Sequence, residues 1–208
     1  MAKNFAEIGF SKSSKDLQEK YGSRASYERM ERITFRNSLT PNEIAFISNR
    51  DSFYISTVGE NGFPYIQHRG GPKGFLKVLD EKRLGFIDFK GNMQYISVGN
   101  LATNNKVCLF LMDYPAKTRL KIYATTEIIE LKENPELYEL LNLETYQFRP
   151  ERMMVFHIEA FDWNCPQHIT PRYTLDEIDT FLAPQREYIS KLEAEIKALK
   201  VQLTANNS

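Results

Sequence analysis

The chain has 208 residues, of which 42% are hydrophobic and 26% are charged, so it is long enough for one sizeable core and an appendage. Its 27 Lys and Arg residues balance 27 Asp and Glu residues, which argues against a general nucleic-acid binder, because that class carries an excess of positive charge. No apolar run approaches the ~20 residues that span a bilayer, and the start MAKNFAEIGF lacks a secretory apolar core, so we expect a cytoplasmic protein.

Residues 1–38 are polar, with mixed charge and only sparse apolar positions such as Leu17 and Tyr21. This composition predicts a loosely packed helical arm. Two interpretations stay open for it, a surface leader and a functional lid.

The sequence predicts a helix directly after this arm. Thr40 is a typical N-cap residue, Pro41 suits the first helical position, and Glu43 completes a capping box. We expect the helix to run to about Asn49.

The next residues change to the alternating pattern of strands. The runs SFYISTV and PYIQH lie on either side of Asn61-Gly62, which is a strong hairpin signal. A second hairpin is predicted from Phe75–Val78 and Leu84–Ile87, joined by a polar turn.

Strands also dominate the rest of the central region. The predicted elements are a short helix or loop over 94–105, a central apolar strand Val107–Met112, a strand Leu120–Leu131, a helix opened by Asn134-Pro135, and a last strand Arg152–Phe161. Because short turns join many of these strands, an antiparallel barrel is favoured over an alternating β–α sheet.

The stretch from Pro64 to Asn100 gathers the unusual chemistry of the chain. Its two glycine-bearing loops, 69–72 and 90–92, would let backbone N–H groups approach a ligand closely. Positive charge and neutral donors stand beside these loops: Arg69, Lys73, Lys77, Lys90, Asn92, Gln94, Ser97 and Asn100. The pattern predicts a surface that binds a phosphate group and stacks against the ring of a heterocycle. A solvated basic hairpin with ordinary turn glycines is the alternative interpretation.

The run GFLKVLD, followed by GNMQYISVGNLATNNKVCLFLMDYP and then by TRLKIYATTEI, resembles the pyridoxamine 5′-phosphate oxidase-like, flavin-nucleotide-binding family. The resemblance spans roughly Phe46 to Arg172 and implies a mainly β, antiparallel split β-barrel with peripheral helices. It also implies a homodimer with FMN in the groove between the subunits. It implies no substrate, because this fold and cofactor site serve several chemistries.

The resemblance also suggests which residues hold FMN. Candidates for the phosphate are Arg69, Lys73 and Ser97. Candidates for the ring and the ribityl chain are the backbone around Phe75, Leu76 and Lys77 and the side chains of Lys77, Asn92, Gln94 and Asn100. Arg119 falls where the family's matching strand turns a polar side chain toward the flavin, and Gln167, His168 and Arg172 come from a region that in the family lies near the partner subunit's flavin. Some relatives carry a basic residue near Met93 or Gly99, and neither residue here can pair with a phosphate.

The segment DWNCPQHITPRYT contains Cys165 and His168, but structural zinc requires four ligands and no other histidine has a matching spacing, so we expect no metal site. A rigid, proline-bounded loop without functional contacts is the second interpretation of this segment.

Beyond this segment, Thr174 and Glu177 form a second capping box, and Pro184 predicts the start of the terminal helix. A coiled-coil seam with spacing 3, 4, 3, 4 follows, formed by Ile189, Leu192, Ile196, Leu199 and Leu203. The seam could lie on the barrel, but self-association is favoured because the opposite face is polar. The expected domains are an arm over 1–38, a split barrel over 39–174 and a terminal helix over 175–208.

We therefore expect an FMN-binding flavoprotein that acts as an oxidoreductase on an unknown small molecule, with no catalytic residue identified. One alternative is a non-catalytic flavin-binding or sensing module. Another is a true pyridoxamine 5′-phosphate oxidase, although the sequence shows no convincing set of substrate-phosphate ligands.

Overall fold

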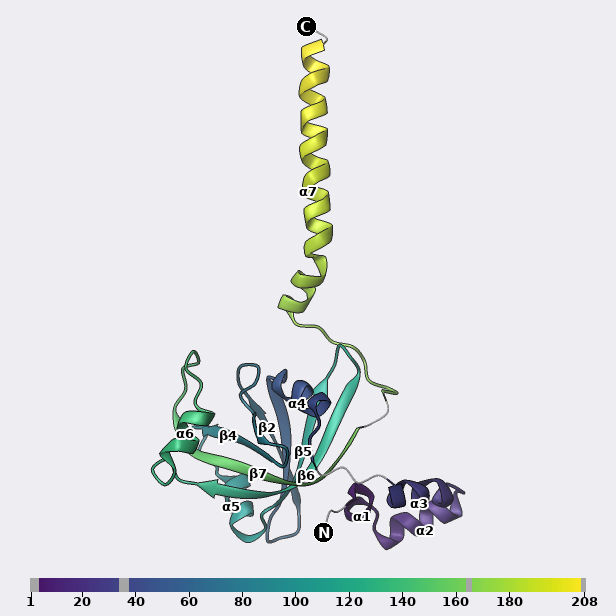
Figure 1. Cartoon of the computed structure of the whole chain (residues 1–208), viewed down its shortest axis with the longest axis vertical. Coiled ribbons are helices and arrows are strands. Elements are labelled where there is room, and N and C mark those ends of the chain that lie inside the picture. The colour runs from purple at the N-terminus through teal and green to yellow at the C-terminus, as the bar shows by residue number, and fades with distance from the viewer. Residues whose placement is uncertain (1–3, 34–37, 164–165, 207–208) are drawn as a thin grey trace. The chain divides into compact units, whose positions relative to one another are not determined.

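The computed structural model describes residues 4–33, 38–163 and 166–206 of the chain. The chain divides into two compact units, one with residues 1–113 and 117–168 and the other with residues 114–116 and 169–208. The helices, labelled in Figure 1, are α1 (Phe5–Gly9), α2 (Lys12–Lys20), α3 (Arg24–Ile33), α4 (Pro41–Ser48), α5 (Ile96–Thr103), α6 (Pro135–Leu141) and α7 (Leu175–Asn206). The strands are β1 (Ser52–Val58), β2 (Pro64–Gly70), β3 (Lys77–Asp80), β4 (Arg83–Phe89), β5 (Lys106–Asp113), β6 (Thr118–Ile129) and β7 (Pro150–Trp163).

The strands of the first unit form one antiparallel sheet in the order β2-β1-β5-β6-β7-β4-β3. The sheet is strongly curved (Figure 1), as twisted antiparallel sheets often are. This is the antiparallel split β-barrel with peripheral helices that the sequence predicts. The strand expected to be central, β5, lies between β1 and β6.

Alternating side chains build the core of this unit. On β1 the inward residues Phe53 and Ile55 are fully buried, and on β5 Leu109 and Leu111 are fully buried. Successive side chains of a strand point to opposite faces, so this alternation fixes the register of each strand. Burial of each such side chain stabilises the fold by roughly 1.5–3 kcal/mol.

The predicted capping box at the start of α4 is present and does more than cap the helix. The carboxylate of Glu43 accepts hydrogen bonds from the backbone N–H and the hydroxyl of Thr40. It also accepts one from Nε1 of Trp163, at 2.7 Å, and Phe46 packs edge-on against the Trp163 ring. Glu43 therefore fastens α4 to the end of β7.

The N-terminal arm is helical, as expected, and its start is packed. Asn4 caps α1 and donates to the backbone carbonyl of Glu31 at 2.7 Å, while Phe5 stacks on Tyr123 of β6 with ring centroids 4.8 Å apart. Further along the arm, Leu17 and Tyr21 are exposed. A further capping box, between Asn4 and Glu7, begins α1, and the sequence analysis missed it.

Two sequence-based expectations about element bounds are wrong. The strand expected over Phe75–Val78 is β3, Lys77–Asp80, because the side chains of Phe75 and Leu76 are buried in the core before the strand begins. Pro184 does not start the terminal helix but lies inside α7, which begins at the Thr174–Glu177 capping box. The expected domain boundaries stay predictions.

In the second unit, α7 has 32 residues, and Arg172 lies over the ring of Tyr114, 5.0 Å from its centroid. Among the residues that the structure describes, no helix is both long enough and apolar enough to cross a membrane.

We predict that Glu43→Gln destabilises the fold in a pH-dependent way. Burial by itself would raise the pKa of Glu43, but the hydrogen bonds from Thr40 and Trp163 outweigh it and hold the pKa below its usual value. The carboxylate therefore adds stability above its unfolded pKa, and this stability is lost as the pH falls through the lower folded pKa. We expect a loss of about 1–3 kcal/mol at pH 7 that shrinks below about pH 4.

Urea unfolding followed by the fluorescence of Trp163, the only tryptophan, measures this difference. Glu60→Gln, at an exposed turn residue, is the control and should change stability by less than about 0.5 kcal/mol. A loss for Glu43→Gln that stays constant from pH 7 to pH 3 would contradict the role of the carboxylate charge.

Candidate functional site

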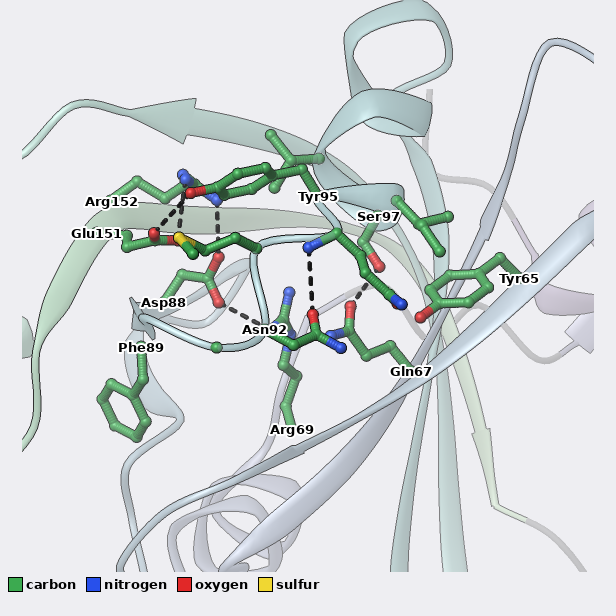
Figure 2. Close-up of a pocket in the computed structure, with 15 residues that line it drawn as sticks. Tyr65, Gln67, Arg69, Asp88, Phe89, Asn92, Tyr95, Ser97, Glu151 and Arg152 are labelled. Carbon is green, nitrogen blue, oxygen red and sulfur yellow. Dashed lines mark hydrogen bonds and ion pairs between the residues drawn. The ribbon is translucent and has the colours of Figure 1, made fainter.

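A small polar cavity of about 40 Å³ lies where β2, the β4–α5 loop, the start of α5 and the start of β7 meet (Figure 2). It is lined by Tyr65, Gln67, Arg69, Asp88, Phe89, Gly91, Asn92, Met93, Gln94, Tyr95, Ile96, Ser97, Val98, Glu151 and Arg152. Most of these side chains are polar, and four of them are charged, which makes the cavity the candidate functional site.

Strand alternation supplies one wall of the cavity. Tyr65, Gln67 and Arg69 occupy every second position of β2 and are half-buried, whereas Ile66 and His68 between them are exposed. Because successive side chains of a strand point to opposite faces, the three cavity residues share one face. Gln67 and Arg69 point toward the middle of the cavity (Figure 2).

A buried carboxylate joins two arginines at the floor of the site. Nη1 of Arg69 lies 2.9 Å from Oδ1 of Asp88, and Nη1 of Arg152 lies 3.2 Å from Oδ2 of the same carboxylate. The side chain of Asp88 is only 3% exposed. The Nε of Arg69 is buried and has no hydrogen-bond partner among the described residues, so one donor of this guanidinium is unused.

Glu151 completes the charge balance. It accepts hydrogen bonds from Arg152 and from the hydroxyl of Tyr95, and the Arg152 guanidinium lies over the Tyr95 ring. Hydrogen bonding to Glu151 raises the pKa of Tyr95. The two arginines and the two carboxylates cancel, so the cavity offers oriented donors with no net charge.

The loop before α5 forms the opposite wall. Met93 and Tyr95 have φ values of 60° and 54°, in the left-handed region, and Oδ1 of Asn92 accepts from the N–H of Gln94 at 3.2 Å. No side chain among the described residues caps the N-terminus of α5. Backbone N–H groups at such a helix start favour an anion, because they lack intrahelical partners and lie at the positive end of the helix dipole.

Two side-chain hydrogen bonds fix α5 against the sheet. Ser97 donates to the amide oxygen of Gln67 at 2.7 Å, and Asn100 donates to the hydroxyl of Thr57 at 3.0 Å. The uncapped helix start is therefore held in place beside Arg69.

The structure brings together four of the residues that the sequence analysis selected, since Arg69, Asn92, Gln94 and Ser97 all line the cavity. Asn100 lies further along α5, bound to Thr57.

The other candidates lie elsewhere. Lys73 is exposed, Phe75 and Leu76 are core residues, and Lys77 lines an open depression beside α4. Arg119 is on β6 opposite Met112, and its Nε is buried without a partner among the described residues. Gln167 and His168 are exposed outside the cavity, and Arg172 belongs to the second unit. Their assignment to a cofactor stays a prediction.

The sequence analysis missed three of the four charged residues that line the cavity, Asp88, Glu151 and Arg152. An acidic residue within the apolar run GFIDF is a usable signal, because an unpaired carboxylate is rarely buried. The pairing of Asp88 with Arg152 could not be predicted from the sequence, because it depends on the register between β4 and β7. Gln67 could have been predicted, because it lies on a predicted strand two residues before Arg69 and so on the same face.

Among the described residues, no group of three or more His, Cys, Asp or Glu side chains could hold a metal ion. Cys165, weighed above as a metal ligand, lies outside the residues that the structure describes.

Comparison with protein families matches residues 39–160 to the family model described as pyridoxamine 5′-phosphate oxidase. Comparison with curated protein sequences finds no match.

Solved structures similar to the chain include HupZ from Group A Streptococcus, at 17% identity and a TM-score of 0.49, covering 65% of this chain and 100% of that one. A protein from Clostridium acetobutylicum, related to general stress protein 26 and described as of the pyridoxinephosphate oxidase family, is 21% identical with a TM-score of 0.45. The match covers 66% of this chain and 93% of that one. An FMN-binding protein from Syntrophomonas wolfei is 17% identical, with a TM-score of 0.43 and coverage of 71% and 97%.

We predict opposite pH trends for two aspartates of the β3–β4 hairpin. Burial raises the pKa of Asp88 against the opposing effect of Arg69 and Arg152. The raised pKa favours the folded state in acid, and this contribution is lost as the pH rises through the folded pKa. Asp88→Asn should therefore gain stability relative to the unmodified chain between about pH 4 and pH 7, by about 1.4 kcal/mol for each unit of raised pKa.

Asp80→Asn is the matched control. Hydrogen bonds from Arg83 and from the backbone of Lys82 outweigh burial and lower the pKa of Asp80. This variant should therefore lose stability relative to the unmodified chain as the pH rises to about 4, with no further change up to about pH 7. Urea unfolding at several pH values gives both trends. Parallel trends in the two variants would contradict the environment assigned to Asp88.

Proposed function

The chain belongs to the pyridoxamine 5′-phosphate oxidase family, and we propose that it is an FMN-binding flavoprotein whose cavity beside α5 holds the FMN phosphate. The observation that carries this proposal is the uncapped start of α5 next to the unused Nε of Arg69. Both features are hydrogen-bond donors, and within the described residues the first has no side-chain cap and the second has no partner. A phosphate supplies acceptor oxygens and negative charge.

The residues around the cavity fit a phosphate ester. Arg69 offers its Nε, while Asn92 and Gln94 offer amide donors from the opposite wall. Asp88 would hold the Arg69 guanidinium in one orientation, so little side-chain entropy is lost when a ligand binds. Ser97 would act chiefly by keeping α5 in place through Gln67.

The size of the cavity limits how much of FMN one chain can enclose. Its 40 Å³ compares with roughly 300–1,000 Å³ for typical small-molecule pockets, so it suits the phosphate end and is too small for the ring system. We propose that the ring lies outside this cavity, in a groove completed by a second copy of the chain. Arg119, Gln167, His168 and Arg172 remain candidates for that groove.

FMN, when bound, supplies hydride or electron transfer at its ring, and the protein would supply position and a site that excludes water. Oxidoreductase activity on a small molecule is part of the proposal. Steady oxidation of NAD(P)H with a small acceptor would support it, whereas tight FMN binding without turnover would support a flavin-binding or sensing module.

We predict that the purified protein binds FMN in preference to FAD, because the cavity suits one terminal phosphate and the sequence has no dinucleotide fingerprint. The absorption spectrum of the purified protein would show bound flavin, and calorimetry compares the two nucleotides. Tighter binding of FAD would contradict the proposal.

We predict that Arg69→Ala weakens FMN by about 1.5–3 kcal/mol, or roughly 10–150-fold, while riboflavin affinity hardly changes. The physical reason is loss of a charge-assisted hydrogen bond to the phosphate, which riboflavin lacks. Flavin fluorescence titration measures both affinities.

Lys73→Ala is the matched comparison, because Lys73 is the other basic candidate and does not line the cavity. It should leave FMN affinity within about three-fold of the unmodified protein. A larger loss for Lys73→Ala than for Arg69→Ala would move the phosphate out of this cavity. Equal losses of FMN and riboflavin in Arg69→Ala would assign Arg69 to the ring or to the fold.

A further inference from the structure

The terminal helix α7 carries an apolar stripe whose residues are exposed, apart from the half-buried Leu182. Leu175 is 79% exposed, Ile196 is 51% exposed and Leu203 is 63% exposed. The 32 residues of the helix extend about 48 Å at 1.5 Å per residue. A long helix with one apolar stripe gains most of its stability by burying that stripe against a partner.

The stripe follows one heptad register from Leu175 to Leu203. One set of seam positions, conventionally called a, contains Leu175, Leu182, Ile189, Ile196 and Leu203. The other set, called d, contains Ile178, Gln185, Leu192 and Leu199. Because α7 begins at Leu175, the seam is about twice as long as the sequence suggested, and Pro184 lies outside both sets.

We propose that α7 pairs with α7 of a second copy of this chain as a parallel, in-register, two-stranded coiled coil. The proposal does not depend on flavin binding. A long run of Leu and Ile at both seam positions is typical of such pairing. In the two central heptads the a positions are Ile189 and Ile196, and the d positions are Leu192 and Leu199, the combination that favours two parallel strands.

Gln185, the one polar residue of the seam, selects the orientation. In a parallel, in-register pair it faces the partner's Gln185, where each amide can donate to the other. An antiparallel pair with the apolar positions opposed would set Gln185 against the partner's Ile196. Each buried amide would then lack a partner, and such a loss is costly.

The charges flanking the seam are compatible with this choice. In the parallel pair, Glu195 lies beside the partner's Lys200, and no like charges meet across the seam. The antiparallel pair would also place opposite charges together, at Asp179 with Lys200 and at Arg186 with Glu193. Exposed ion pairs contribute little compared with the cost of burying an unpaired amide, so the Gln185 layer decides the orientation.

Cysteine cross-linking of the full-length chain tests the proposal. In a background with Cys108→Ser and Cys165→Ser, the seam variants Leu192→Cys and Leu199→Cys should each form a disulfide with the same residue of the partner under mild oxidation. The control Ala194→Cys, on the opposite face of the same helix, should form it at least about ten-fold more slowly, because its thiols face away from the partner.

Non-reducing electrophoresis gives the rates. Rapid cross-linking at both seam positions and slow cross-linking at the control supports the parallel pair. If coexpressed Leu182→Cys and Leu199→Cys chains cross-link to each other while neither cross-links alone, the pair is antiparallel and the proposal is wrong. Equally slow cross-linking at all positions would also overturn it.

Discussion

The contact of Arg69 with Asp88 is the constraint that sets where β2 lies against β4 in the first unit. In the sheet order, β1, β5, β6 and β7 lie between β2 and β4, so no backbone ladder joins the two strands. The guanidinium and the carboxylate, 2.9 Å apart, bridge them. Burial raises the pKa of Asp88, so the contact carries a desolvation cost and is weak evidence for stability. We infer that the ion pair chiefly fixes the position of β2 relative to β4, because these two strands share no backbone hydrogen bonds.

The same contact builds the cavity. Asp88 also binds Arg152, and Arg152 and Tyr95 both bind Glu151, so the curved sheet carries a set of oriented polar groups. Ser97 then ties the uncapped α5 to Gln67, on the strand that carries Arg69. Closure of the barrel and the candidate anion site therefore use one set of side chains, and a substitution at this floor should be examined for its effects on both stability and binding.

Elements with local signals were predictable from the sequence. The capping box at Thr40 needs only the three residues that follow it, and the Asn61-Gly62 hairpin needs only the alternation beside its turn. The charged floor of the site was not predictable, because Asp88 and Arg152 meet through strand pairing across 64 residues of sequence. The basic residues Lys73 and Lys77 lie near the glycines in sequence but do not line the cavity, because closeness in sequence does not decide which wall of the fold a side chain joins.

Pro184 shows how a local signal can hide a periodic one. Proline inside a helix removes one backbone hydrogen bond, so it was read as a helix start, although the spacing of the seam continues through it. The full seam also connects the two proposals. A flavin groove shared by two chains requires their split barrels to meet, and a parallel coiled coil attaches both barrels at the same end. An antiparallel pair would attach them at opposite ends of helices about 48 Å long, so cross-linking of α7 also bears on whether one dimer can contain both features.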